Sequence, residues 1–385
     1  MEALRQLRWE LGPDNCVVIH LTLIPYLKAA KELKTKPTQH SVKELLRSGV
    51  QPDILACRTE YPLNKDLRKK LALFCNVETE AVIEAMDAET IYDVPLLMAK
   101  ENLDSIVLSK LKLPVLKEPD LKTWKEFIHR LKNPTQSVNI GLIGKYNELQ
   151  DAYKSIYESF VHAGAENLCK VNVIPIHAEK LILSDGEMEM ISKLDGILVA
   201  PGFGERGIQG KLAAIKKARE ENIPFFGICL GMQCAVVEFA QNVCGLTNAA
   251  TTEVDPQTEH PVIDMMESQK ALTQKGGTMR LGSYKCEIKK NSKAYEAYGT
   301  QKINERHRHR FEYNNHYKTI LEENGLINTG YNPDTGLVEI VELPNHPWFV
   351  GVQYHPELKS TVEKPHPLFV AFVKACLENK SKNNA

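Results

Sequence analysis

The sequence lacks a dominant charge: 48 lysines and arginines balance 49 aspartates and glutamates, for a net charge of −1. A chain without a global field gives no reason to expect nucleic acid or a membrane surface as its partner. No apolar stretch is long enough to span a bilayer, and the amphipathic N-terminus is not a signal peptide. We therefore expect a cytoplasmic protein with neither a nucleic-acid nor a membrane partner.

The sequence also lacks the patterns that cysteines form in disulfide frameworks and zinc sites. Nine cysteines are scattered along the chain without paired spacing, which favours a reducing cytosol. No CxxC pair or Cys/His cluster indicates zinc, and we predict no metal site in this chain. The phosphate-binding pattern GxxxxGK[ST] is absent as well.

What is present is the alternation of strands and helices that is typical of an α/β protein. A length of 385 residues suits two or three domains. We predict a first α/β domain over 1–112, a linker helix region over 113–137, a second domain over 138–380 and a polar tail over 381–385. Both domains should contain a mostly parallel sheet flanked by helices.

Within the first domain, the pattern predicts strands over 16–23, 53–58 and 73–77 and a polar loop over 32–41. The chain opens on a helix that leads into a lone apolar strand, which resembles the middle of a domain. The linker region carries Pro114, Pro119 and Pro134 around one charged amphipathic helix.

The most informative stretch is GICLGMQ, residues 227–233, which joins an apolar run to a helical pattern. It places Cys229 at a sharp strand-to-helix turn, where glycines provide positive φ and close backbone approach. The free N–H groups and the positive end of the following helix favour a thiolate. This is the nucleophile-elbow arrangement. The alternative is a buried cysteine in an ordinary turn.

A cysteine nucleophile needs a base and an oxyanion site. His355 ends an apolar strand, and Glu357 lies two residues further on, close enough to orient the imidazole. The N–H of Leu230 and the glycine loop at Gly202 could hold an oxyanion. The alternatives are a histidine that caps a turn before Pro356 and a plain glycine turn.

Two polar stretches remain open at this point. Residues 305–310 form the densest basic run, which suits a nucleotide patch, an arginine clamp on a carboxylate or a solvated loop. Residues 34–39 offer two cations and two hydroxyls that suit phosphate oxygens, or else form a polar surface loop.

Several of these stretches carry a resemblance to known families. GICLGMQ with YHPE at 354–357 resembles the class I glutamine amidotransferases, whose catalytic triad is Cys-His-Glu. KTKPTQHSVKEL at 34–45, GTMRLG at 277–282 and ERHRHRF at 305–311 resemble the CTP synthase family, and this resemblance covers about residues 21–374. It implies a C-terminal class I glutamine amidotransferase domain, preceded by an incomplete P-loop-NTPase-like synthase domain.

The resemblance also implies roles for individual residues. Cys229 is the nucleophile, His355 moves protons and Glu357 orients the histidine. The residues implied in glutamine binding are Gly202, Leu230, Gly231, Met232, Gln233, Glu253 and Arg310, with Glu253 on the amino group and Arg310 on the carboxylate. Those implied in UTP and CTP binding are Lys34, Thr35, Lys36, Pro37, Thr38, Gln39 and Lys70. Met86, Asp87 and Ala88 are implied in ATP binding.

The implied activity is that of a ligase in pyrimidine biosynthesis, which aminates UTP to CTP with ATP and with ammonia released from glutamine. Implied co-substrates are ATP and Mg²⁺, GTP is the implied activator, and the implied assembly is a homotetramer. Family members carry an N-terminal P-loop and magnesium-binding acidic residues, neither of which occurs here. We therefore expect glutaminase activity without CTP formation by this chain alone. The alternatives are a glutaminase subunit of another triad amidotransferase and a non-catalytic remnant that acts in assembly.

Overall fold

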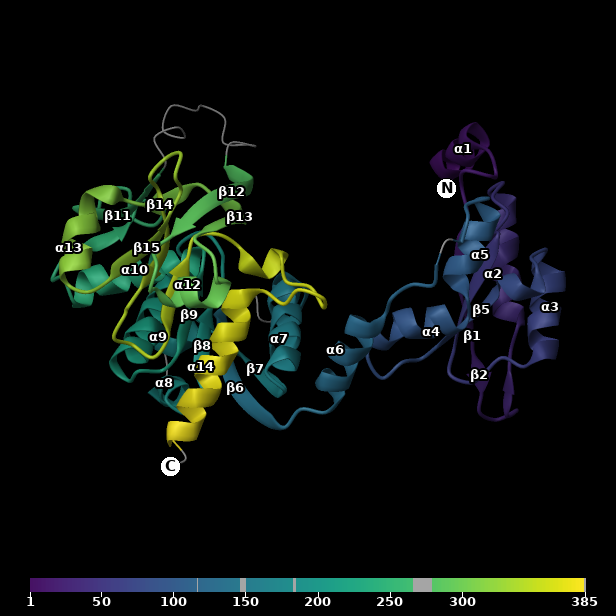
Figure 1. Ribbon diagram of the computed structural model, residues 1–385, viewed down its shortest axis with the longest axis horizontal. Coiled ribbons are helices and arrows are strands. Elements are labelled where there is room, and N and C mark those ends of the chain that lie inside the picture. The colour runs from purple at the N-terminus through teal and green to yellow at the C-terminus, as the bar shows by residue number, and fades with distance from the viewer. Residues whose placement is uncertain (116, 146–149, 183–184, 266–278, 384–385) are drawn as a thin grey trace. The chain divides into compact units, whose positions relative to one another are not determined.

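The computed structural model describes residues 1–115, 117–145, 150–182, 185–265 and 279–383 (Figure 1). The chain divides into two compact units, Met1–Thr123 and Trp124–Ala385. This division lies inside the segment 113–137, which the sequence predicts as a linker. None of the helices in the described ranges is both long and apolar enough to cross a membrane.

The first unit contains a parallel three-stranded sheet in the order β1-β4-β5, which are Ile19–Ile24, Ile54–Thr59 and Val82–Met86. Helices α2 (Lys36–Arg47) and α3 (Lys65–Cys75) share one apolar cluster with it. Helices α4 (Val94–Lys100) and α5 (Leu103–Lys110) contribute Met98, Leu103 and Ile106 to another cluster, around Ile54 and Ile83. The remaining elements are α1 (Glu2–Leu11), β2 (Tyr26–Leu27) and β3 (Glu32–Leu33).

Two predictions for this unit are wrong. Residues 73–75 end helix α3 and form no strand: Leu71, Ala72 and Cys75 are buried at helical spacing while Leu73 is 77% exposed. Asn76 then ends the helix in the left-handed conformation, at φ 53. The predicted loop 32–41 instead contains strand β3 and the start of helix α2. The helix can begin here despite Pro37, because a proline is tolerated in the first turn.

The second unit begins in helix α6 (Lys122–Lys132), the helix that was predicted to be a linker. It buries Phe127 and Ile128, and the Phe127 ring meets the edge of His162 at 6.0 Å between centroids. Arg130 also forms an ion pair with Glu166 at 2.9 Å. The helix therefore packs as part of the second unit.

A nine-stranded sheet organises this unit, in the order β13-β12-β15-β16-β17-β9-β8-β6-β7. Strands β6 to β9 and β17 run parallel, and the remaining four are antiparallel. The strands are β6 (Gln136–Gly144), β7 (Cys169–His177), β8 (Gly196–Val199), β9 (Phe225–Ile228), β12 (Arg280–Ile288), β13 (Lys302–His309), β15 (Ile327–Tyr331), β16 (Val338–Glu342) and β17 (Phe349–Val352).

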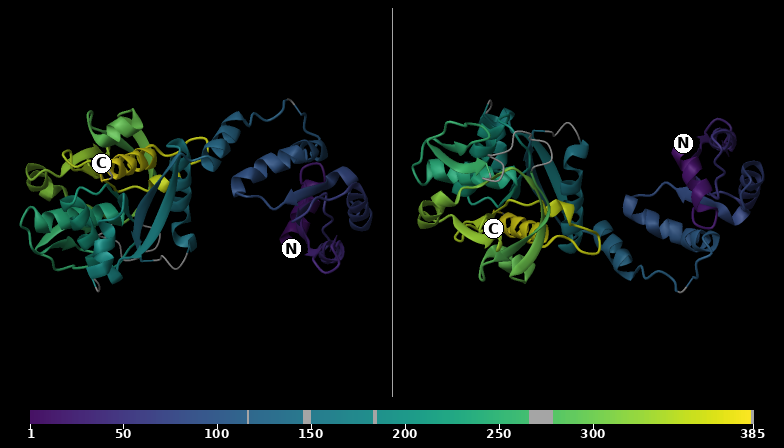
Figure 2. Two further views of the ribbon diagram at one scale, coloured as in Figure 1. Left: turned by 90° about the horizontal axis from the view of Figure 1, so that it is seen from below. Right: turned by 90° about the horizontal axis from the view of Figure 1, so that it is seen from above.

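Helices cover both faces of this sheet, as the two views in Figure 2 show. One apolar cluster joins it to α7 (Lys154–Glu166), α12 (Lys293–Tyr298) and α14 (Pro367–Asn383). The other joins it to α8 (Asp185–Ile191), α9 (Ile208–Glu220), α10 (Leu230–Asn242) and α13 (Lys318–Glu323). A small sheet of β10 (Ala249–Thr251), β11 (His260–Met265) and β14 (Phe311–Tyr313) lies against the second cluster.

Short 3₁₀ helices occupy Thr79–Ala81, Ile91–Asp93, Gln150–Tyr153, Lys180–Ile182, Asn315–Tyr317 and Pro356–Leu358. Residues 381–383 of the predicted polar tail continue helix α14. Residues 384 and 385 lie outside the described ranges.

Gly210, in the first turn of α9, lets this helix approach the chain after β7. A Cβ there would lie 1.6 Å from the carbonyl oxygen of Ala178. Helix propensity alone would favour Gly210→Ala by about 1 kcal/mol. We expect the opposite sign, a loss of about 3 kcal/mol, because the clash is with backbone. Thermal unfolding should show a Tm lowered by roughly 6–12 °C.

Gly245→Ala provides the matched control. Gly245 has φ +73 and nothing within 4 Å of its Cβ position. It should therefore lose only about 1 kcal/mol, through backbone strain alone. A Gly210→Ala variant as stable as the unmodified chain would contradict the close approach of α9.

Candidate active site

Cys229 lies between strand β9 and helix α10, at φ 52 and ψ −104. This positive φ is unusual for a residue with a side chain and marks a strained turn. The glycines on either side are needed for space: a Cβ on Gly231 would lie 2.2 Å from the Val199 carbonyl oxygen. The elbow therefore forms as predicted, except that the cysteine itself takes the positive φ.

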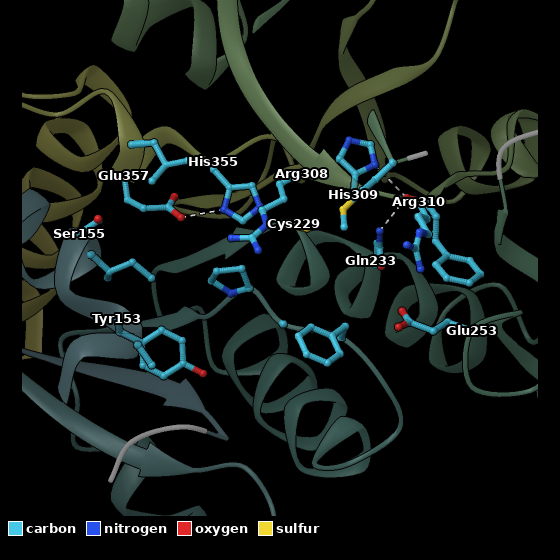
Figure 3. A pocket seen from close by; sticks show the side chains of 18 residues that line it. Tyr153, Ser155, Cys229, Gln233, Glu253, Arg308, His309, Arg310, His355 and Glu357 are labelled. Atoms are coloured by element: carbon cyan, nitrogen blue, oxygen red, sulfur yellow. Dashed lines mark hydrogen bonds and ion pairs between the residues drawn. The ribbon is translucent and has the colours of Figure 1, made fainter. Parts of the chain in front are cut away.

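His355 follows strand β17 and is held at both its main chain and its ring. Its main-chain N–H donates to the Arg306 carbonyl oxygen at 2.8 Å. Its Nδ1 donates to Oε1 of Glu357 at 2.7 Å, so that Nε2 remains for proton exchange (Figure 3). The carboxylate thus fixes the ring in the tautomer that a general base needs.

The electrostatics of His355 favour its charged form. Burial disfavours the imidazolium, but the negative charge of Cys229 and then that of Glu357 outweigh burial and raise the pKa of His355 to about 10. At neutral pH the histidine is therefore protonated, beside the sulfur of Cys229.

A cavity of about 610 Å³ opens in front of Cys229, a size that accommodates a small substrate. Figure 3 shows Glu357 and His355 at one end of it and Glu253 and Arg310 at the other. Its lining residues are Ala152, Tyr153, Ser155, Ile156, Pro201, Gly202, Phe203, Cys229, Gln233, Glu253, Met279, Arg308, His309, Arg310, Phe311, His355, Glu357 and Leu358.

The residues predicted to bind glutamine divide into two groups. Gly202, Gln233, Glu253 and Arg310 line the cavity with the triad. The side chains of Leu230 and Met232 are buried under the elbow, and Gly231 packs against the Val199 carbonyl. The roles implied for Leu230, Gly231 and Met232 in glutamine binding stay predictions. Glu253 is oriented by the N–H of Gly204, which donates to Oε1 at 2.8 Å.

The basic run at 305–310 is mostly strand β13, not a solvated loop. Its side chains alternate: Glu305, His307 and His309 are buried, while Arg306 and Arg308 are exposed. Burial, followed by the charge of Arg280, lowers the pKa of His307 to about 2 and that of His309 to about 3. Both histidines are therefore neutral, and the run is much less positive than its sequence indicates.

Sequence reasoning missed two buried polar residues beside the site. Lys211 on α9 is fully buried, and its Nζ donates to the Ala200 carbonyl oxygen at 2.9 Å, just before the Gly202 loop. Gln353 is fully buried, with its Nε2 3.7 Å from the Cys229 sulfur. A lone amide at the end of an apolar strand could have identified Gln353. No sequence signal distinguishes Lys211 from an exposed helical lysine.

In the first unit, the residues predicted to bind UTP and CTP lie at the start of α2 and on α3. Thr35, Thr38 and Gln39 are buried, and Oγ1 of Thr38 donates to the Leu23 carbonyl oxygen at 3.1 Å. Oγ1 of Thr35 accepts from Nε2 of Gln39 at 3.2 Å, so both hydroxyls have partners inside the unit. The role implied for these residues in UTP and CTP binding stays a prediction. Lys36 and Pro37 are exposed, Lys34 is half-buried beside Glu32, and Lys70 is exposed on α3.

The predicted ATP-contact residues Met86, Asp87 and Ala88 lie at the end of β5. Asp87 accepts a hydrogen bond from Arg58 Nε at 3.0 Å. Within the part of the chain that the structure describes, no three His, Cys, Asp or Glu side chains gather to hold a metal ion. Gly277 and Thr278 of the GTMRLG stretch lie outside the described ranges.

Comparison with known proteins places these features in a family. The family model "CTP synthase N-terminus" matches residues 1–113, and "Glutamine amidotransferase class-I" matches residues 148–375. The CTP synthase of Cytophaga hutchinsonii is 65% identical over 375 residues, which cover 97% of this chain and 69% of that protein. The CTP synthase of Christiangramia forsetii is 63% identical over 383 residues, 99% of this chain and 70% of that protein.

A solved structure gives the same result for the second unit. The glutaminase domain of Trypanosoma brucei CTPS, with bound acivicin, is 34% identical with a TM-score of 0.60. The match covers 63% of this chain and 94% of that domain. The chain belongs to the CTP synthase family, and its second unit is a class I glutaminase domain.

Proposed function

We propose that Cys229, His355 and Glu357 hydrolyse glutamine and release the ammonia that CTP synthesis consumes. The observation that carries this proposal is the buried His355–Glu357 pair, which lines the same cavity as the cysteine of a strained elbow. The test is glutamate release by the purified chain, with Cys229 present and with it replaced.

The geometry supports a two-step mechanism. The Cys229 thiolate attacks the side-chain amide carbon of glutamine, and the carbonyl electrons move to oxygen. The imidazolium of His355 then gives its Nε2 proton to the departing nitrogen, so that ammonia leaves and a thioester remains. His355 next takes a proton from water, which attacks the thioester and frees glutamate and the thiolate.

The oxyanion in both steps would lie between the elbow and the Gly202 loop. The N–H of Leu230 is the first free donor of helix α10, and Gly202 lies beside the Leu230 side chain. Because these are main-chain groups in a buried site, they stabilise the developing charge without reorganisation. Lys211 supports this loop from below through the Ala200 carbonyl oxygen.

At the other end of the cavity, Glu253 would accept the amino group of glutamine and Arg310 would bind its carboxylate. Their charges are opposite to those of the two groups, and both side chains line the cavity. The bound acivicin in the Trypanosoma brucei domain supports a small-molecule site in this fold.

Glu253→Gln and Arg310→Ala are each expected to raise KM for glutamine by on the order of tenfold to a hundredfold, through loss of a charged hydrogen bond. Alkylation of Cys229 by iodoacetamide, which has neither group, should change much less. Arg306→Ala is the control, because Arg306 is an exposed arginine on strand β13, four residues before Arg310. Equal effects on KM and on alkylation would contradict a role in substrate recognition.

For the first unit, we propose binding of UTP and CTP at Lys34, Lys36 and Lys70 around the start of α2, and of ATP near Met86–Ala88. The match to the CTP synthase N-terminus supports these sites. Mg²⁺ would arrive with ATP, as the resemblance to the family implies. Activation by GTP, assembly as a homotetramer and a cytoplasmic location complete the proposal, by analogy with the family.

A further inference from the structure

Gln353 contacts the nucleophile directly. It directly follows strand β17 and lies two positions before His355, and its side chain is fully buried. Its Nε2 donates to the Cys229 sulfur at 3.7 Å, within the range for a hydrogen bond to sulfur. Its Oε1 accepts from Nε2 of Gln233 at 3.2 Å.

The orientation of both amides follows from one main-chain carbonyl. Gln233 Nε2 lies 2.9 Å from the Phe311 carbonyl oxygen, which can only accept. The Gln233 amide must therefore present its nitrogen there, and its second N–H points to Gln353. Gln353 must then turn its oxygen to Gln233 and its nitrogen to the sulfur. A flipped Gln353 amide would place two donors together and an oxygen against a thiolate.

The strand does not need this side chain for its own hydrogen bonding. The main-chain N–H of Gln353 already donates to the Glu339 carbonyl oxygen at 2.9 Å. The fully buried amide is instead satisfied by Gln233 and Cys229, and a donor aimed at an anionic sulfur gains more than one aimed at a neutral thiol.

We propose that Gln353 is a further catalytic residue of glutamine hydrolysis, which donates a hydrogen bond to the Cys229 thiolate and is held in that orientation by Gln233 and the Phe311 carbonyl. This rests on the proposed glutaminase function. The bond stabilises the attacking thiolate. When water cleaves the thioester, the C–S electron pair returns to sulfur, and the same N–H stabilises the leaving thiolate.

Other groups also act on this sulfur and define what the test must separate. His355 faces it from the loop after β17, and Lys211 interacts with it from α9. The thiol of Cys234 on α10 interacts electrostatically with Cys229, and also with the charges of Glu253 and Lys145. All of them remain in place when only the Gln353 amide is changed.

The experiment measures alkylation of Cys229 by iodoacetamide as a function of pH, followed at the Cys229 peptide by mass spectrometry. Gln353→Leu should move the alkylation midpoint up by about one to two pH units, because the thiolate loses a donor. Its kcat/KM for glutamine should fall on the order of tenfold to a hundredfold. Gln353→Glu, which keeps the shape and thus the fold, should move the midpoint in the same direction.

Gln241→Leu is the matched control, because Gln241 lies on α10 and donates to a main-chain carbonyl, that of Ala249, at 2.7 Å. It should leave the midpoint and kcat/KM unchanged. Gln233→Leu should raise the midpoint, since it frees the Gln353 amide to turn. Unchanged midpoints in both Gln353 variants would overturn the proposal. Glutamate release by a Cys229→Ala chain would instead overturn the glutaminase function itself.

Discussion

Cys229→Ala is expected to lower kcat for glutamine hydrolysis by on the order of 10⁴-fold or more. The thiolate is the only atom of the triad that bonds to substrate, and its removal leaves only binding and the oxyanion site. The fold should survive, because alanine keeps the Cβ in the elbow and removes one buried sulfur. The measurement is glutamate release with saturating glutamine, alongside thermal unfolding.

Cys234→Ala is the matched control for this change. Cys234 lies on the same helix, is 3% exposed and does not line the cavity. Burial raises its pKa to about 11, so it stays an unreactive thiol at neutral pH. If glutaminase activity survived in Cys229→Ala and was lost in Cys234→Ala, the nucleophile would be Cys234 and the assignment to Cys229 would be wrong.

Glu357→Gln is the second large effect, with kcat expected to fall by about 10²- to 10⁴-fold. The amide retains the shape of the carboxylate but not its charge, so it lowers the pKa of His355. A histidine whose pKa is raised by folding stabilises the native state below its unfolded pKa, near 6.5. That stability is lost as pH rises through the folded value of about 10.

Removing the Glu357 charge should therefore move the alkaline limb of both activity and stability to lower pH. Measuring kcat as a function of pH gives the alkaline limb of activity, and measuring the denaturant midpoint as a function of pH gives that of stability. Glu363→Gln, an exposed carboxylate in the following loop, should change neither. An alkaline limb in Glu357→Gln at the original pH would show that the carboxylate does not set the charge of His355.

The elements that the sequence predicted well are those with a local cause. The turn at 227–233 depends on glycines that clear nearby backbone, and the strand before His355 is continuously apolar. The strand predicted over 73–77 is wrong because a short apolar run is compatible with either a strand or the last turn of a helix. Only the packing of Leu71 and Cys75 against the sheet decides between them.

Long-range contacts explain what sequence reasoning missed. Strand β13 pairs with β12 and turns His307 and His309 inward. The sequence does not indicate this alternation of buried and exposed side chains, because all six residues from 305 to 310 are charged residues or histidines. The contact between Gln353 and Cys229 joins residues 124 positions apart. The role of the Gln353 amide depends on Gln233 and on a main-chain carbonyl in a third segment, which no single motif contains.

The positive φ of Cys229 has a consequence for how this sequence can change under selection. A side chain in that conformation costs on the order of 1–3 kcal/mol, which glycine would largely avoid. Selection for stability alone would therefore favour replacement of Cys229 by glycine. A lineage that keeps a cysteine at 229 must be under continuous selection for the reaction, and in this chain Cys229, His355 and Glu357 are all in place.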